Sequence, residues 1–381
     1  MKKQLGVLLG LVAVLLVVAG LPASAGSSNE GKVSILAWPG YAEDGSTDKS
    51  IDWVTPFEKK TGCKASVKTF GTSDEAFQLF STGQYDVVSA SGDSSLRSIA
   101  NGDAAVIKTA RIKSYGDLAD FLVKQQNNSV GNKVYGVPHG WGANLLMFNT
   151  DVVTPAPTSW GVVFDPSSPH AGSVTAYDSP IYIADAALYL SKTKPELGIT
   201  NPYSLDREQF DAAVDLLKEQ KGIIGEYWSD YLKEEEAFIK GSLVLGTTWQ
   251  VITNVVQADE TAPPVEAIVP EEGSTAWSDN WMIHSDAKHP NCAYAWVNWI
   301  TSPKVQAQVA EYFGEAPANL KACDNTEDPS FCETYHADDP TYYEQLHYWT
   351  TPTAKCLDGR TNVKCVPYKE WTAAWDEIKG S

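Results

Sequence analysis

Positive charge is scarce in this sequence of 381 residues. The chain has 29 lysine and arginine residues against 48 aspartate and glutamate residues, which gives a formal net charge of −19. Such a field repels nucleic acid and anionic lipid head groups, and it speeds the arrival of cations. We therefore expect no nucleic-acid partner. The charge is compatible with a cationic ligand, although acidity that only keeps the chain soluble would give the same balance.

Sequence motifs for catalysis are missing as well. The chain has no glycine-rich phosphate loop, no His-Glu-x-x-His, no Gly-x-Ser-x-Gly elbow and no cysteine placed as a nucleophile beside a histidine. The nearest approach to an elbow, at Ser91, lacks the first glycine. We therefore expect a protein that is not an enzyme and has no cofactor. An exported hydrolase is the less favoured alternative.

The sequence has a single long apolar run, and it lies near the N-terminus. It extends from Leu5 to Leu21 behind two lysines, and Ala23-Ser24-Ala25 follows it. A basic start, an apolar centre and a small-residue end are typical of a secretory signal. The alternative is a membrane anchor, since about 17 apolar residues is near the lower limit for a bilayer span. We expect residues 1–25 to be a signal peptide cleaved after Ala25, and the product to be periplasmic and not membrane-embedded.

Cysteine is infrequent, with six residues in the chain, all of them after the signal segment. An even number in an exported protein favours disulfides over free thiols, although sequence alone does not fix the connectivity. Two pairs close short local loops, namely Cys323 with Cys332 and Cys356 with Cys365, which leaves Cys63 and Cys292. A zinc site is the competing interpretation. We expect no metal, because no Cys-x-x-Cys spacing exists and the six histidines are scattered.

Apolar segments alternate with helical patterns after the signal segment. Strands are expected at 33–38, 64–70 and 85–89, with helices between them at 51–60 and 74–80. This alternation indicates an α/β fold with a largely parallel sheet. A second block repeats the pattern, so we expect two lobes. It has strands at 145–148, 172–176 and 242–247 and helices at 183–190 and 207–218.

The C-terminal part is expected to be less regular. Residues 290–314 form a long helical region that Ser302-Pro303 interrupts. Residues 323–364 are rich in Pro, Asp, Thr and Tyr, which predicts an irregular segment held by disulfides. A final helix is expected over 369–378.

Aromatic side chains occur beside turns and carboxylates where the predicted strands end. Strand ends are where ligands bind in open α/β sheets. Rings and carboxylates together suit an organic ammonium ion, because each ring face contributes about 0.5 to 2 kcal/mol and a buried unpaired charge is costly. For any single aromatic residue the alternative is a place in the core, since the 13 tryptophans must mostly be buried. The clusters are Trp38-Pro39-Gly40-Tyr41, Ser91-Gly92-Asp93, His139-Gly140-Trp141-Gly142, Tyr177-Asp178-Ser179-Pro180, Thr248-Trp249-Gln250 and Trp277-Ser278-Asp279-Asn280-Trp281.

Several short motifs carry a family resemblance that extends to about Asn319. They are Trp38-x-x-Tyr41, Phe57-Glu58-Lys59-Lys60-Thr61-Gly62, Tyr85-Asp86-Val87-Val88, Gly136-Val137-Pro138, Gly246-Thr247-Thr248-Trp249, Pro270-Glu271-Glu272-Gly273 with Trp277-Ser278-Asp279, and Pro303-Lys304-Val305. Together they resemble the spermidine/putrescine-binding periplasmic proteins, within the bacterial extracellular solute-binding receptors of ABC importers. The pattern is most similar to the YdcS-like branch.

The resemblance implies a two-lobed periplasmic-binding-protein fold, the Venus-flytrap arrangement. Each lobe would be a mainly parallel sheet flanked by helices, with the ligand cleft between the lobes. We expect lobe 1 in residues 32–137 and 265–315, and lobe 2 in residues 138–264 and 316–381. In this fold Cys63 and Cys292 would lie at the starts of a strand and a helix of the same lobe, where they could pair.

The resemblance also implies a set of ligand-binding residues. Trp38, Tyr41, Trp249 and Trp277 would line an aromatic box, Trp141 would lie nearby, and Asp178 and Asp279 would face the amines. The chain departs from the family pattern, because Ile181 and Glu315 stand where many polyamine receptors have a glutamate and an aromatic residue. Another family aromatic falls at Gly92 or Asp93. We therefore expect Asp93 and Glu315 to supply relocated carboxylates.

These expectations combine into one function. The chain would be a monomeric receptor that captures a polyamine of the putrescine and spermidine class and delivers it to the permease subunits of an ABC transporter. Another cationic or amino-acid-derived solute is the alternative ligand.

Overall fold

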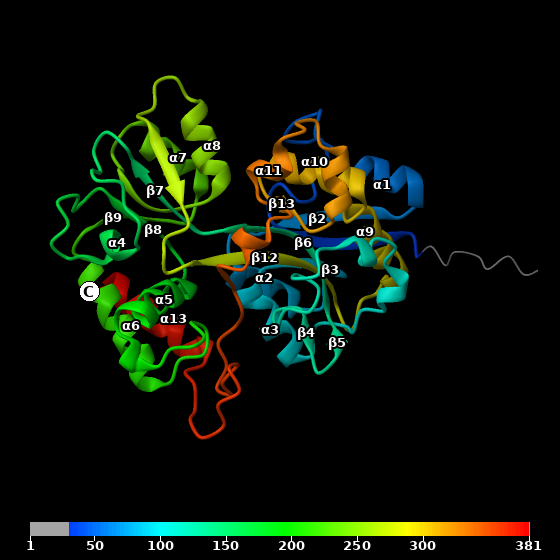
Figure 1. The fold of residues 1–381 in the computed structure, drawn as a ribbon. Helices are drawn as coiled ribbons and strands as arrows, with labels where there is room; N and C mark the ends of the chain where they lie inside the picture. Colours follow the sequence, from blue (N-terminus) through cyan, green and yellow to red (C-terminus); the bar gives the residue numbers. More distant parts are fainter. Residues whose placement is uncertain (1–29, 381) are drawn as a thin grey trace, which may run out of the picture.

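Residues 30–380 are described by the structure, a computed structural model. They form two α/β lobes, each built on its own sheet (Figure 1). The expected signal peptide, residues 1–25, lies outside the described residues. Within residues 30–380, no helix has the length and the apolar character that a bilayer span requires.

Lobe 1 is built on a seven-stranded sheet in the order β13-β6-β12-β3-β1-β2, with β14 paired to β12. Side chains alternate across it, so Ile35 packs into the core cluster that includes Phe57 and Trp296, while Leu36 packs on the opposite face with Phe80. The strands are β1 (Lys32–Ala37), β2 (Lys64–Thr69), β3 (Val87–Ala90), β6 (Gly136–Ala143), β12 (Ser274–Ile283), β13 (Ala316–Pro317) and β14 (Leu346–Tyr348). The helices are α1 (Val54–Thr61), α2 (Ser73–Phe80), α3 (Gly92–Asn101), α9 (Pro290–Ile300), α10 (Pro303–Phe313), α11 (Phe331–Thr334) and α12 (Pro340–Tyr343), and a small hairpin is made by β4 (Ser129–Val130) and β5 (Lys133–Val134).

Lobe 2 is built on a five-stranded sheet in the order β11-β7-β10-β8-β9. The strands are β7 (Leu145–Asn149), β8 (Val174–Tyr177), β9 (Ile224–Trp228), β10 (Leu245–Thr248) and β11 (Val265–Ile268). The helices are α4 (Gly161–Phe164), α5 (Ile183–Thr193), α6 (Arg207–Gln220), α7 (Tyr231–Ile239), α8 (Gln250–Ala258) and α13 (Tyr368–Gly380). In Figure 1 the red α13, from the end of the chain, lies beside α5 and α6 of this lobe.

Helix α6 shows how local sequence sets an element. Phe210, Val214 and Leu217 are buried, as their helical spacing predicts. The helix begins with a capping box, in which the Asp206 side chain accepts from the backbone N–H of Gln209 and the Gln209 side chain accepts from the backbone N–H of Asp206. The predicted helix at 207–218 is therefore confirmed.

Three chain crossings join the lobes. The first runs from β6 to β7 through Asn144, the second from β11 to β12, and the third leaves β14 at Tyr348 and enters lobe 2 at Trp349. The Asn144 side chain donates a hydrogen bond to the Thr275 hydroxyl at 2.7 Å, which ties the first crossing to the second. The backbone N–H of Trp349 donates to the carbonyl of Ala276 at 2.7 Å, which ties the third crossing to the second.

The two sheets divide the chain differently from the expected ranges. Strand β6 and residues 316–348, with β13 and β14, join the lobe 1 sheet, whereas β11 joins the lobe 2 sheet. Both sheets are also mixed rather than mainly parallel, since β12 runs antiparallel to β3 and β7 antiparallel to β10. The physical reason is the crossings. A strand that enters a sheet directly from the other lobe has no helical crossover behind it and is free to run against its neighbours.

All six cysteines form disulfides. Cys63, directly before β2, bonds to Cys292 in the first turn of α9, with an S–S distance of 2.04 Å, and the two short loops close as the spacing suggested. The implied pairing of Cys63 with Cys292 is confirmed. The first bridge links residues 229 positions apart within lobe 1.

Candidate functional site

A buried cluster of one phenol and two carboxyl groups lies where lobe 1 meets the crossings. The Tyr41 Oη lies 2.9 Å from Asp279 Oδ2 and 2.6 Å from Glu315 Oε2. All three residues are buried. A phenol has one hydrogen to donate, so the second short contact requires a proton on one of the two carboxyl groups.

Backbone features place the three side chains together. Tyr41 follows β1 through a turn in which Gly40 has a φ of +91°, a conformation that glycine adopts without strain. The register between β12 and β6 shifts between Ser278 and Asn280, so Asp279 has no paired residue in β6. Glu315 directly follows Gly314, the C-cap of α10, which has a φ of +83°.

Two glycines of β6 leave room for the site. A Cβ added at Gly140 would lie 2.0 Å from the carboxyl group of Glu315, and one added at Gly142 would lie 2.7 Å from the ring of Trp277. No larger residue fits at either position without moving these side chains. The His139-Gly140-Trp141-Gly142 segment therefore contributes to the site through its backbone.

Burial controls the protonation of the cluster. It raises the pKa of Asp279 to about 7; hydrogen bonding from Ser91 and Tyr41 opposes this rise, and the negative charge of Asp93 adds to it. Burial also raises the pKa of Glu315 well above its usual value, although the Tyr41 hydroxyl opposes this effect. Asp279 Oδ1 and Glu315 Oε1 have no hydrogen-bond partner in residues 30–380. Two carboxyl groups with free oxygens thus share one buried space.

No cation among residues 30–380 neutralises this cluster within hydrogen-bond distance. His139 Nε2 lies 3.5 Å from Glu315 Oε1, but burial lowers the pKa of His139 to about 3, so the imidazole is neutral. The described residues form no Lys or Arg ion pair with either carboxyl group. A bound cation would therefore supply positive charge that the described residues do not place at this cluster.

An aromatic row leads from this cluster into lobe 2. The ring centroid of Phe313 lies 4.6 Å from that of Tyr41 and 6.1 Å from that of Trp277. Trp277 meets Trp249 at 5.9 Å, and Trp249 meets Trp228 at 4.9 Å. The Trp249 indole donates to Asn144 Oδ1 at 3.0 Å, at the first crossing. The row therefore spans both lobes and touches a crossing.

Two further candidates lie at the carboxyl ends of β1 and β3. The Trp38 indole donates to the Ser91 hydroxyl at 3.2 Å, and its ring packs on Phe70 at 4.4 Å. Asp93, in the first turn of α3, is buried, and burial raises its pKa to about 6. The structure thus brings Trp38 and Asp93 to the carboxyl ends of two inner strands, and one of these strands, β3, pairs with β12, which carries Asp279.

Trp141 lies at the far side of the aromatic row. Its ring is buried and packs against Phe121 and Tyr348, at centroid distances of 5.3 and 6.1 Å. It shares a small cavity of about 10 Å³ with Trp249 and Trp277. Trp141 is therefore adjacent to the predicted box, and its ring packs in the lobe 1 core.

The family follows from the sequence match. Residues 52–337 match the family described as bacterial extracellular solute-binding protein. The chain belongs to this family. The resemblance inferred from the motifs is thereby confirmed, and the two-lobed solute-binding fold accounts for the position of the Tyr41, Asp279 and Glu315 cluster at the crossings.

Similar proteins of known name agree with this family. The spermidine/putrescine-binding periplasmic protein of Escherichia coli K12 is 26% identical over 294 residues, which cover 74% of this chain and 80% of that one. The putrescine/agmatine-binding protein of Pseudomonas aeruginosa is 26% identical over 292 residues, covering 71% and 77%.

Solved structures share the fold of this solute-binding protein. The PotD substrate-binding protein of a spermidine/putrescine ABC transporter from Streptococcus pneumoniae has a TM-score of 0.67 at 20% identity, covering 91% of this chain and 97% of that one. The Tp0655 (TpPotD) lipoprotein of Treponema pallidum has a TM-score of 0.73 at 17% identity, covering 92% and 100%. The expected two-lobed α/β fold is confirmed.

Asp178 is placed differently from the expectation for this solute-binding protein. Its carboxylate accepts hydrogen bonds from the Trp375 indole at 2.8 Å and from Lys379 Nζ at 2.8 Å, both from α13. Asp178 is placed this way because the C-terminal helix α13 packs at the end of β8 and supplies the cation of Lys379. Asp178 is therefore already paired, and the structure does not bring it into the Tyr41, Asp279 and Glu315 cluster.

Sequence reasoning missed two residues near the site. Phe313 bridges Tyr41 and Trp277, and its place directly before Gly314-Glu315 was the available signal. Trp349 approaches α3 so closely that a Cβ on Gly92 would lie 1.8 Å from its carbonyl oxygen. No motif in the irregular tail marked Trp349, because its position depends on the third crossing.

Proposed function

We propose that this protein is the non-catalytic receptor of an ABC importer and that it captures a polyamine of the putrescine and spermidine class between its lobes. The buried pair of Asp279 and Glu315 around one phenol is the observation that carries the proposal. The names of the related proteins, which include spermidine, putrescine, agmatine and cadaverine binders, support the same class of ligand.

The charge of the cluster favours a ligand with more than one ammonium group. With a cation bound, the free oxygens of Asp279 and Glu315 each gain a partner. Ionisation of both carboxyl groups then requires Tyr41 to give up one of its two contacts, because the phenol has one hydrogen to donate. Asp93 adds a third buried carboxyl group close enough to influence the pKa of Asp279. A buried unpaired ammonium ion is prohibitively costly, so several carboxylates in one buried region match a ligand with several charges.

The aromatic row supplies the second half of recognition. Trp277 and Trp249 come from β12 and from the residue before α8, so a ligand held between them would contact both lobes. A ring face next to an ammonium or a methylene chain stabilises either group. The proposed ligand-binding residues are Trp38, Tyr41, Asp93, Trp249, Trp277, Asp279 and Glu315.

The cellular setting follows the family. As a solute-binding protein the chain would act with the permease subunits of its transporter, as a monomer in the periplasm after removal of residues 1–25. The anionic field of the whole chain would speed the arrival of a polycation.

A thermal-shift panel tests the proposal. The mature protein would be melted with putrescine, cadaverine, spermidine, spermine and neutral controls. A ligand at 100 times its dissociation constant raises the free energy of unfolding by about 2.7 kcal/mol, so at least one di- or polyamine should raise the melting temperature. Stabilisation by a neutral or anionic solute, with no response to any amine, would contradict the proposal.

A further inference from the structure

A chain of hydrogen bonds leads from the proposed amine site through two crossings to a buried acid of lobe 2. The Trp249 indole donates to Asn144 Oδ1 at 3.0 Å, and the Asn144 amide donates to the Thr275 hydroxyl at 2.7 Å. Thr275 in turn donates to Asp185 Oδ1 at 2.8 Å, and Tyr177 donates to Asp185 Oδ2. Trp249 is partly buried and the other four residues are buried. Asp185, in the first turn of α5, is therefore linked to a proposed ligand-binding ring by three hydrogen bonds.

Chemistry fixes the direction of every bond in this chain. An indole nitrogen can only donate, so Asn144 presents its oxygen to Trp249 and its amide hydrogens to Thr275. The one hydrogen of the Thr275 hydroxyl then points to Asp185, and the one hydrogen of Tyr177 points to the other carboxyl oxygen. All donors are thus directed toward Asp185, which accepts at both oxygens, as an ionised carboxylate does.

Protonation of Asp185 would disturb this order. A protonated carboxyl group carries its hydrogen on one of two oxygens, and each oxygen of Asp185 already faces a hydroxyl donor. Thr275 or Tyr177 would have to turn its hydrogen away, which removes one hydrogen bond. Hydrogen bonds to an ionised acceptor are also about twice as strong as neutral ones, and bonds in a chain polarise one another. Ionised Asp185 therefore holds the chain more firmly than protonated Asp185.

The surroundings of Asp185 make its charge change near neutral pH. Burial raises its pKa to about 7, although hydrogen bonds from Tyr177 and Thr275 oppose this rise. Within residues 30–380 it forms no ion pair with a lysine, arginine or histidine. The titratable groups around it are the phenols of Tyr177, Tyr182 and Tyr203, whose pKa values its negative charge helps to raise.

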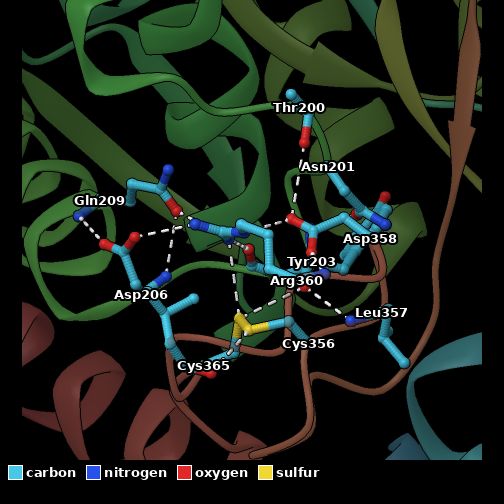
Figure 2. A network of polar contacts seen from close by, with 12 residues as sticks. Thr200, Asn201, Tyr203, Asp206, Gln209, Cys356, Leu357, Asp358, Arg360 and Cys365 are labelled. Atoms are coloured by element: carbon cyan, nitrogen blue, oxygen red, sulfur yellow. Dashed lines mark hydrogen bonds and ion pairs between the residues drawn. A yellow bond between two sulfur atoms is a disulfide. The ribbon is translucent and has the colours of Figure 1, made fainter.

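Tyr203 does not compete for Asp185. Its hydroxyl donates to the carbonyl of His347 at 2.6 Å. Figure 2 shows Tyr203 in the segment that Arg360 fixes, where the guanidinium donates to the Asp206 carboxylate at 2.8 Å. Arg360 also donates to the backbone carbonyl of the residue after Tyr203, at 2.5 Å. Tyr203 is therefore held with its hydrogen directed away from Asp185.

The chain also reaches the third crossing. The Tyr177 ring packs against Trp349, with ring centroids 5.7 Å apart, and Trp349 is the residue at which this crossing enters lobe 2. Asn144 and Thr275 belong to the first and second crossings. Asp185 and its two donors therefore lie where the connections between the lobes converge.

We propose that Asp185 is a positioning residue of the amine site, whose carboxylate holds the Trp249 indole in place through Thr275 and Asn144 without contacting the ligand. Its role in amine binding rests on the proposed function, whereas the hydrogen-bond chain does not. Amine binding should strengthen as Asp185 becomes an anion, and this effect is separate from that of the carboxyl groups beside the ligand.

The indole N–H signal of Trp249 tests the chain in ligand-free mature protein with isotope-labelled tryptophan, and the Trp249→Phe variant identifies the signal. Between pH 5 and pH 9 the signal should shift with a midpoint near pH 7. The shift should vanish in Asp185→Asn and persist in Asp279→Asn, which removes the other buried carboxyl group with a pKa of about 7. A signal that does not titrate in the parent, that titrates equally in Asp185→Asn, or that stops titrating in Asp279→Asn would overturn the proposal.

Calorimetry with putrescine tests the role in binding. At pH 8, Asp185→Asn should bind about tenfold more weakly than the parent, the equivalent of about 1.4 kcal/mol, whereas the exposed control Asp215→Asn should bind as the parent does. At pH 5 the difference should disappear, because Asp185 is then protonated in the parent. An affinity within twofold of the parent at pH 8, or the same loss at both pH values, would overturn the positioning role. If the parent itself binds no amine, the proposed function fails, and a pH-dependent Trp249 signal would still confirm the chain.

Folding and chain connectivity are checked by further variants. Because the folded pKa of Asp185 lies above its ordinary value of 3.8, its ionisation lowers the free energy of unfolding at pH 8, so Asp185→Asn should melt no lower than the parent there. Thr275→Val removes the hydroxyl and should reproduce both effects of Asp185→Asn, whereas Thr275→Ser keeps the hydroxyl and should behave like the parent. Since both residues act through one chain, the double variant with Asp185→Asn and Thr275→Val should bind putrescine no more weakly than either single variant. Additive losses would refute the chain.

Discussion

Replacing Asp279 by asparagine should stabilise the ligand-free protein and weaken amine binding. Burial raises the pKa of Asp279 from 3.8 to about 7. Because the folded pKa lies above the unfolded one, the folded state binds the proton more tightly, and the free energy of unfolding falls as the pH rises from about 4 through about 7. The difference between the folded pKa of about 7 and the ordinary pKa of 3.8 corresponds to about 4 kcal/mol in the free energy of unfolding at pH 8. At pH 8 the ligand-free Asp279→Asn protein should therefore unfold at a higher temperature than the parent, and at pH 4 the difference should vanish.

The effect on binding has the opposite sign. With asparagine at position 279, a bound ammonium ion loses one anionic partner inside a buried site. Removing one side of a buried charge pair costs about 3 to 5 kcal/mol, which corresponds to a loss of about two to three and a half decades in affinity. The variant should thus be more stable without ligand and less responsive to ligand.

Melting curves at pH 4 and pH 8, with calorimetry of putrescine at pH 8, measure both effects. The exposed Asp151 provides a matched control, since Asp151→Asn should change neither quantity. A ligand-free Asp279→Asn protein that melts below the parent at pH 8 would refute the burial argument. Putrescine affinity within threefold of the parent would remove Asp279 from the site.

Three further predictions follow from the same contacts. The rise in melting temperature that putrescine causes in the parent protein should grow from pH 5 to pH 8, because the pKa of Asp93 is raised to about 6 and this carboxyl group becomes an anion in that range. A rise in melting temperature that stays constant over this pH range would argue against a role for Asp93. Asp178→Asn should leave calorimetric putrescine affinity within about threefold, because Asp178 is paired with Lys379; a hundredfold loss would restore it to the site. Replacing Cys63 and Cys292 by serine opens a loop of 229 residues and should lower the free energy of unfolding in urea by about 5 kcal/mol, whereas a loss below 1 kcal/mol would contradict this estimate.

Local patterns predicted much of the fold and part of the site. Helix α6 could be predicted because its buried residues and its cap lie within one short segment. Tyr41 could be named because it follows a strand end in an α/β sheet. Asp279 could be named only from the family resemblance, because it lies within β12 at the register shift rather than at a strand end. The structure then brought them within hydrogen-bond distance of each other.

Long-range contacts account for what the sequence left out. The pairing of Asp178 with Lys379 joins residues 201 positions apart, and no local pattern signals it. Strand β14 has three residues, too few for periodicity to mark, and its pairing with β12 places Trp349 beside α3. The lobe boundaries were misplaced for the same reason, since membership of a sheet depends on pairing partners that lie far away in the chain.

Calorimetric titration of the mature protein with putrescine and with butylamine at pH 8 tests the central claim most directly. The two compounds share a four-carbon chain and differ by one ammonium group. If several buried carboxylates recognise a polyamine, putrescine should bind with one-to-one stoichiometry and butylamine at least about a hundredfold more weakly, the equivalent of about 2.7 kcal/mol for the second charge. Equal affinity for the two, or no binding of putrescine, cadaverine or spermidine, would contradict the account.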